Sequence, residues 1–176
     1  MYKLVFMTLI TSLLVGCSSK SVLMSPNTNL RLLEGNIYAN VAGQNIDKRV
    51  LDQLTREIKG QLIIAGFNID NNATNINLKI QVTEFTPGNA ALRMMPGFGA
   101  GRGSLVYLAE YMNQEGNTLA KMKGEERFTG LEVSYNQNYG VATTLGGEET
   151  VTKVLIKEAA KHIVELALSP EKNEKN

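Results

Sequence analysis

The sequence contains a single cysteine, no tryptophan and only 6% aromatic residues. One cysteine excludes an intramolecular disulfide, so the fold must depend on its apolar core alone. The chain also lacks the cysteine pairs of structural zinc sites and of thiol redox centres. With 43% hydrophobic and 20% charged residues, the composition is that of an ordinary folded domain. Its 176 residues allow one modest domain.

Neither sign of charge dominates the chain. The 18 basic and 17 acidic residues give a formal net charge of +1, and Lys3 is the only charged residue before Cys17. The chain from Cys17 onwards is therefore neutral. Sequence-independent binding of nucleic acid needs a broad basic field. We therefore expect no nucleic-acid partner.

The beginning of the chain has the pattern of a secretory leader. Lys3 is followed by an apolar stretch over residues 4–15, which is too short to cross a bilayer, since a spanning helix needs about 20 apolar residues. The stretch ends in a motif that resembles the bacterial lipobox, in which small residues precede a cysteine that receives a diacylglyceryl group: Leu14, Val15, Gly16 and Cys17. We predict that residues 1–16 are removed and that acylated Cys17 joins the protein to membrane lipid.

Polar residues follow the predicted anchor. Residues 17–30 show no periodicity, which indicates a lipidated N-terminus and a tether. The 13 residues of the tether, 18–30, would reach at most about 45 Å when fully extended. By similarity to Gram-negative sorting signals, Ser18 in place of an aspartate points to the outer membrane. We therefore expect the periplasmic face of the outer membrane, with the inner membrane as the alternative.

Hydrophobic periodicity predicts one domain over residues 31–168, followed by a charged tail over residues 169–176. Strands are predicted where apolar residues alternate or run together, at 31–41, 76–83, 104–113 and 119–128. Apolar residues three or four apart predict one helix from an Asn45 N-cap to Gly66 and another from Glu148 to Pro170. Residues 131–147 have no period and are predicted to be a long loop. The order β-α-β-β-β-α predicts a two-layer α+β fold, with a mostly antiparallel four-stranded sheet and two amphipathic helices on one face.

A glycine-rich segment over residues 87–103 separates two of the predicted strands. Glycine permits positive φ and close backbone approach, and successive backbone N–H groups can hold an anion. Dinucleotide and P-loop motifs need a helix after the glycines, whereas a strand follows here. The alternatives are a structural crossover between strands and an adaptable apolar surface for a partner. The candidate ligand or partner residues are Arg93, Met94, Met95, Gly97, Phe98, Gly99, Gly101 and Arg102.

The sequence offers few groups for catalysis. His162 is the only histidine, and we expect it to be a partly buried or solvated structural residue beside the apolar positions of the second helix. It has no accompanying Gly-x-Ser-x-Gly motif, and a zinc site would need carboxylates for most of its ligands. The acidic pair at 125–126 is predicted to point to opposite faces of a strand. We predict no catalytic residue, metal or cofactor; a hydrolase using His162 is the enzymatic alternative.

Several motifs resemble those of the bacterial lipoproteins that carry domain of unknown function 4410, over roughly residues 32–168. The resemblance depends on the predicted strand at 76–85 and four features that follow it: residues 86–88, Arg93, residues 97–102 and a turn at 115–117. The sequence departs from the family pattern at Gly103, where a small residue such as alanine is usual, and at residues 133–139. The resemblance implies an α+β lipoprotein domain and no particular activity.

From these features we expect a non-enzymatic lipoprotein that binds a protein of the cell envelope as an accessory in envelope assembly or secretion. The alternative is a module that binds a small anion or the cell wall through the glycine and arginine segment.

Overall fold

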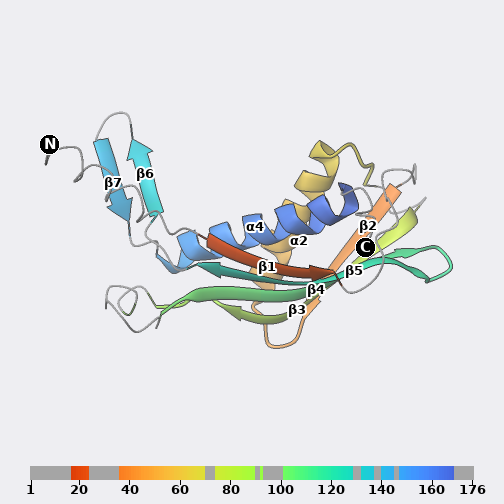
Figure 1. The fold of residues 1–176 in the computed structure, drawn as a ribbon, viewed down its shortest axis with the longest axis horizontal. Coiled ribbons are helices and arrows are strands. Elements are labelled where there is room, and N and C mark those ends of the chain that lie inside the picture. The colour runs from red at the N-terminus through yellow and green to blue at the C-terminus, as the bar shows by residue number, and fades with distance from the viewer. Residues whose placement is uncertain are drawn as a thin grey trace, which may run out of the picture.

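The computed structural model describes residues 17–23, 36–69, 74–89, 92, 101–128, 132–136, 140–144 and 147–168. A five-stranded sheet in the order β1-β5-β4-β3-β2 forms one layer, and two helices cover one of its faces (Figure 1). The elements of this domain are β1 (Cys17–Leu23), β2 (Asn36–Gly43), α2 (Lys48–Ile64), β3 (Thr74–Thr86), β4 (Gly103–Asn113), β5 (Thr118–Phe128) and α4 (Glu148–Leu168). Among these elements, the predicted α+β fold and its β-α-β-β-β-α order are confirmed from β2 to α4.

Strand pairing in the sheet is mostly antiparallel, as expected. β3 with β4, β4 with β5 and β5 with β1 pair in this way. β2 is the exception, because it pairs in parallel with β3, with Val41 opposite Ile80. Parallel neighbours need a crossover connection, and α2 lies in that connection.

The fifth strand corrects the predicted tether. Residues 18–23 lie in β1, which pairs antiparallel with β5 from Cys17 opposite Phe128 to Leu23 opposite Met122. Such pairing uses backbone groups, which every residue type here provides. Its sequence, CSSKSVL, has no apolar alternation because four of its first five residues are serine or lysine, so periodicity could not detect it. The sheet has five strands instead of four, and residues 24–30 lie outside the described residues.

The N-cap of helix α2 lies two residues after the predicted cap. Asn45 has a φ of 59°, in the left-handed region, and does not cap the helix. Asp47 does so instead, since its side chain accepts a hydrogen bond from Arg49 N at 2.8 Å. Gly66, with a φ of 91°, follows the end of the helix as predicted. The predicted apolar face is confirmed in the buried residues Val50, Leu54, Ile58 and Leu62.

The hairpin of β4 and β5 closes at the predicted turn, where Gly116 has a φ of 83°. The prediction of an irregular loop over residues 131–147 is wrong in part. Glu132–Asn136 (β6) and Gly140–Thr144 (β7) pair antiparallel as a separate two-stranded sheet. Their sequences, EVSYN and GVATT, alternate over too few residues to give a clear period of two.

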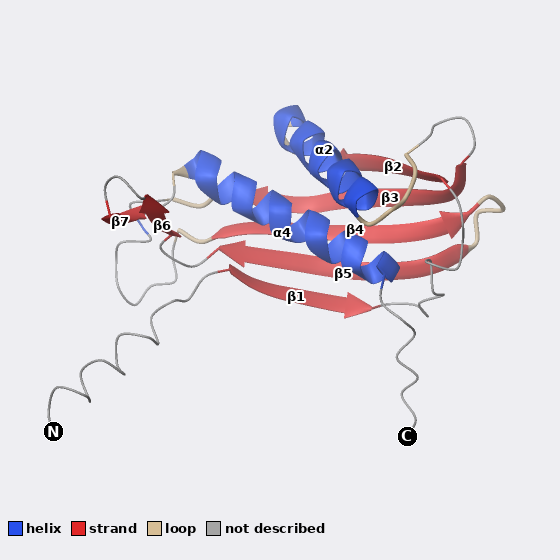
Figure 2. Cartoon of the chain, turned by 90° about the horizontal axis from the view of Figure 1, so that it is seen from above, coloured by secondary structure: helices blue, strands red, loops and turns tan. Residues whose placement is uncertain are grey.

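The core lies between the sheet and the two helices (Figure 2). Alternate residues of β4 and β5 are buried against the helices, and α4 contributes eight buried residues from Val151 to Ala167. Tyr111 is fully buried, and its hydroxyl donates a hydrogen bond to the carbonyl oxygen of Ile163 at 2.9 Å. This bond joins the middle of the sheet to α4. Neither helix in the described part of the chain is long and apolar enough to cross a membrane.

Candidate functional site

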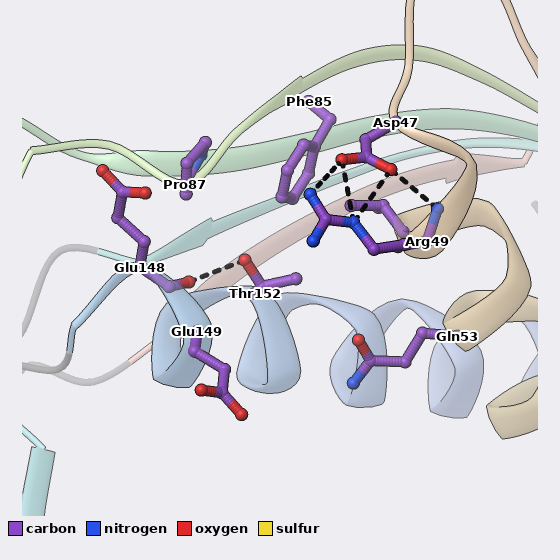
Figure 3. Close-up of a pocket in the computed structure, with 9 residues that line it drawn as sticks. Asp47, Arg49, Gln53, Phe85, Pro87, Glu148, Glu149 and Thr152 are labelled. Atoms are coloured by element: carbon purple, nitrogen blue, oxygen red, sulfur yellow. Dashed lines mark hydrogen bonds and ion pairs between the residues drawn. The ribbon is translucent and has the colours of Figure 1, made fainter.

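A pocket of about 460 Å³ opens where the two helices begin, beside the end of β3 (Figure 3). Its apolar part consists of Val50, Phe85 and Pro87, and its polar part comes from the first turns of α2 and α4. The polar lining residues are Asp47, Arg49, Gln53, Glu148, Glu149 and Thr152.

On the α2 side of the pocket, the charges of Asp47 and Arg49 neutralise each other in an ion pair. Arg49 Nη2 lies 2.8 Å from Asp47 Oδ2, and Arg49 N donates to Asp47 Oδ1, also at 2.8 Å. These hydrogen bonds from Arg49 hold the pKa of Asp47 below its usual value. The guanidinium is therefore already occupied by a carboxylate two residues away.

The α4 side is acidic. Glu149 is exposed and pairs with Lys153 at 2.7 Å, and hydrogen bonding by that lysine lowers the pKa of the carboxyl. Glu148 is also exposed, and its carbonyl oxygen accepts a hydrogen bond from Thr152 Oγ1 at 2.6 Å. Figure 3 shows the Glu148 side chain on the Pro87 side of the helix and Glu149 on the other side.

Three carboxylates and one guanidinium line the pocket. Arg49 pairs with Asp47 and Lys153 pairs with Glu149, so after these two pairs the lining keeps the one negative charge of Glu148. Opposite charges attract and like charges repel over these short separations, less strongly where water screens them. An ammonium or guanidinium group with an aliphatic stem matches both the acidic rim and the apolar part. An anion does not match this rim.

The stem of the predicted glycine and arginine loop lies next to the pocket. Asn89 N donates to the carbonyl oxygen of Gly101 at 3.1 Å, which closes the connection between β3 and β4. Gly88, with a φ of 72°, lies directly against the backbone of Gly101 and Arg102, where a side chain would collide. We call residues 87–89 and 101–103 the neck. Pro87 belongs both to the neck and to the pocket lining.

Gly103 allows close packing beside the neck. It is buried, and a Cβ atom at this position would collide with Cγ1 of Val151 in the first turns of α4. Glycine therefore lets α4 approach the sheet beside the neck.

The structure places only part of the predicted loop. Gly101 has a φ of 81°, and Arg102 is exposed at the neck. The other candidates lie outside the described residues: Arg93, Met94, Met95, Gly97, Phe98 and Gly99. The predicted cleavage motif, Leu14, Val15 and Gly16, also lies outside them, and Cys17 is the first residue of β1.

A second polar cluster lies beneath α4, and sequence reasoning missed its central residue. Glu126 is fully buried; Tyr107 Oη donates to its Oε1 at 3.0 Å, and His162 Nδ1 lies 3.0 Å from the same oxygen. Burial, with the nearby Glu126 carboxylate as a smaller cause, raises the pKa of Tyr107. His162 is partly buried, its side chain 24% exposed, which is one of the two settings expected for it. The cluster joins the sheet to α4.

The signal for Glu126 was present in the sequence. It follows Ala120, Met122 and Gly124 at every second position, so it shares their buried face. Glu125 points to the other face and pairs with Arg127, as predicted for this acidic pair. In the described part of the chain, no group of three or more histidine, cysteine, aspartate or glutamate residues is arranged to hold a metal ion.

The neck and the strands around it fall within a known sequence family. The model of domain of unknown function 4410 (DUF4410) matches residues 38–129, which is just over half of the chain. The chain belongs to this family. The match extends from β2 to the end of β5 and includes the whole β3–β4 connection. Among curated proteins, none matches the sequence.

Several solved structures are similar to this DUF4410 protein in fold. The PelC dodecamer from Paraburkholderia phytofirmans has a TM-score of 0.52 at 11% identity, over 88% of this chain and 99% of that chain. A singly substituted form of the PelC dodecamer from the same organism has a TM-score of 0.49 at 9% identity, with the same coverage. A protein from Caulobacter crescentus, described as a candidate lipoprotein, has a TM-score of 0.47 at 14% identity, over 80% and 93% of the two chains. At these identities the likeness concerns the fold alone.

Proposed function

We propose that this DUF4410 protein is a bacterial lipoprotein, held by acylated Cys17 at the periplasmic face of the outer membrane. In this proposal it is a non-enzymatic accessory that binds a protein partner in envelope assembly or secretion. The observation that carries the proposal is the leader ending in Leu14, Val15, Gly16 and Cys17, which contains the only cysteine of the chain. Two or more acyl chains give durable attachment, at about 0.8 kcal/mol for each buried methylene group.

Labelling with radioactive palmitate tests the anchor. The wild-type protein should incorporate label and fractionate with outer membranes, whereas Cys17→Ser should incorporate none and accumulate as an unanchored or uncleaved precursor. Ser18→Asp is the matched control for sorting, because it should keep the label and move the protein to the inner membrane. Label retained by Cys17→Ser would contradict the proposal.

The pocket is the surface that we assign to the protein partner. It combines exposed carboxylates with an apolar part at Val50, Phe85 and Pro87. A lysine or arginine side chain of a partner could place its stem on the apolar part and its charge at the rim, and such paired contacts contribute specificity. The partner's contact residue is therefore expected to be basic.

Photo-cross-linking in intact cells tests the pocket. A cross-linking amino acid at Gln53, which lines the pocket, should give a discrete adduct, and one at the exposed Arg56 on the same helix serves as the control. Glu148→Lys should remove the Gln53 adduct, because it replaces a negative charge on the rim with a positive one. Equal adducts at the two positions, or none at Gln53, would refute the assignment.

The second candidate is a module that binds a small anion. Gly101 with its positive φ and the exposed Arg102 favour it, whereas the three carboxylates of the adjacent pocket oppose it. Calorimetry with inorganic phosphate should then show heat for the wild type and less for Arg102→Ala. No heat with the wild type would exclude this candidate.

A further inference from the structure

The residue predicted to carry the lipid belongs to the sheet itself. Cys17 is the first residue of β1, and its backbone lies opposite Phe128. The pairing covers all seven residues of β1 and ends with Leu23 opposite Met122. No spacer separates Cys17 from the folded domain.

Cys17 also lies at one defined end of the sheet. Phe128 pairs with Gly103 on its other side, and Ser104 pairs with Thr86, so β1 and β4 start where β5 and β3 finish. The helices α4 and α2 begin at this same end (Figure 2). We call it the anchor end. The neck and the pocket belong to it, since Gly103 contacts Val151 in α4 and Pro87 lines the pocket.

The opposite end is far from Cys17. β4 has 11 residues, so the turn at Gly116 lies about 35 Å from the anchor end, at about 3.3 Å for each residue of a strand. An extended tether of 13 residues could have reached further than this and allowed any orientation. A paired strand removes that freedom.

We infer that the anchor end of the domain faces the bilayer, with the neck and the pocket near the lipid headgroups and the β4–β5 turn directed away. This inference depends on the proposed acylation of Cys17. Removal of residues 1–16 would make Cys17 the first residue, so the acylated residue lies at the anchor end, where β1 begins. Leu92, 42% exposed and joined through its N to Asn89 Oδ1 at 3.2 Å, adds apolar surface beside the neck.

This orientation restricts which proteins can reach the proposed pocket. A pocket beside the headgroups is reached from the membrane surface. Its partner would therefore present a basic group close to that surface, as a membrane protein or a membrane-bound peptide does.

Fluorescence quenching by lipid tests the orientation. Acylation occupies the only native thiol, so one introduced cysteine can be labelled selectively in the full lipoprotein reconstituted into vesicles. Glu148→Cys and Glu165→Cys form a matched pair, because each removes one exposed glutamate from α4. The two positions are 17 residues apart, about 25 Å along the helix, and we expect at least about two-fold stronger quenching at Glu148 by a headgroup-attached nitroxide.

The possible results distinguish a wrong orientation from a failure of the proposed lipidation. Equal quenching at the two positions, or stronger quenching at Glu165, would overturn the inference, since a domain lying on β1 or moving freely gives no advantage to Glu148. If the wild-type protein fails to float with vesicles and Cys17 itself takes up the label, the proposed lipidation is what fails.

Discussion

Glu126 lies on the apolar side of the sheet because β5 alternates without interruption from Ala120 to Phe128. A buried carboxylate is costly unless it is hydrogen-bonded, and Tyr107 and His162 both contact its Oε1. Gly124 provides the space, since a side chain there would occupy the position of the Tyr107 ring. The packing of each of these residues therefore depends on the others.

Gly124→Ala should destabilise the protein. The added methyl group would collide with the Tyr107 ring and hydroxyl, and overpacking of a core costs about 1–3 kcal/mol. Gly60→Ala is the opposite control: Gly60 lies within α2 with open space around its missing Cβ, so alanine should stabilise by about 0.5–1 kcal/mol. Urea unfolding measures both changes. A Gly124→Ala variant as stable as the wild type would contradict the packing described.

Burial raises the pKa of Tyr107 and of Tyr111 above the ordinary value of 10.0. In the unfolded chain both hydroxyls lose their protons near pH 10, so above that pH the folded state binds more protons than the unfolded state. Their contribution to stability is complete below about pH 10 and is lost as the pH rises beyond it. Urea unfolding should therefore give a lower free energy at about pH 11 than at about pH 8.

Tyr111→Phe should reduce this loss, since phenylalanine has no proton to release. Val50→Ala is the control, because it removes apolar contacts without changing any titratable group and should lower stability similarly at both pH values. The same pH dependence in Tyr111→Phe and the wild type would show that Tyr111 does not titrate differently in the two states.

Among the elements, β1 has the least sequence signal and the clearest structural consequence. Its backbone covers one edge of β5 from Met122 to Phe128, and an uncovered strand edge leaves unpaired N–H and C=O groups. Residues 18–23, which were predicted to be part of a tether, therefore belong to the domain.

Removal of residues 17–23 tests whether β1 contributes to the stability of the domain. An unlipidated protein that starts at Met24 should unfold at lower urea than one that starts at Cys17→Ser, with a loss of about 1 kcal/mol or more because several ladder hydrogen bonds disappear. Hydrogen exchange should speed up in β5 and remain unchanged in β2, which pairs with β3 at the other edge. A tether would leave both stability and exchange unaltered.

At the scale of the whole molecule, one core joins the sheet and both helices. Leu54 from α2 and Leu155 from α4 are fully buried in the same cluster. A single core in a domain of this size favours cooperative unfolding without stable intermediates.

Leu54→Ala and Leu155→Ala should each lower the free energy of unfolding by about 2–5 kcal/mol, because each leaves a cavity. In both variants the circular dichroism and tyrosine fluorescence transitions should coincide. Separate transitions for the two signals would show that one helix unfolds independently of the sheet.

Much of the fold could be predicted from the sequence, because burial on one face imposes a period on the residues. The periods of β3 and α2 gave their location, and Gly66 and Gly116 gave the end of a helix and the position of a turn. The pocket could not be predicted in this way. The sequence shows Asp47 and Glu148 only as charges near two helix starts, about 100 residues apart, and no local pattern states that those starts meet.

The sequence by itself determined the lipobox-like motif that ends at Cys17, the neutral charge of the chain from Cys17 onwards, and the α+β class, since these depend on residue types and their spacing. Tertiary structure alone decided that Tyr107 and His162 are the partners of Glu126 and that residues 17–23 pair with β5. The physical reason is common to both. Backbone pairing and the meeting of distant side chains are set by the packing of whole elements, which no local pattern of residue types shows.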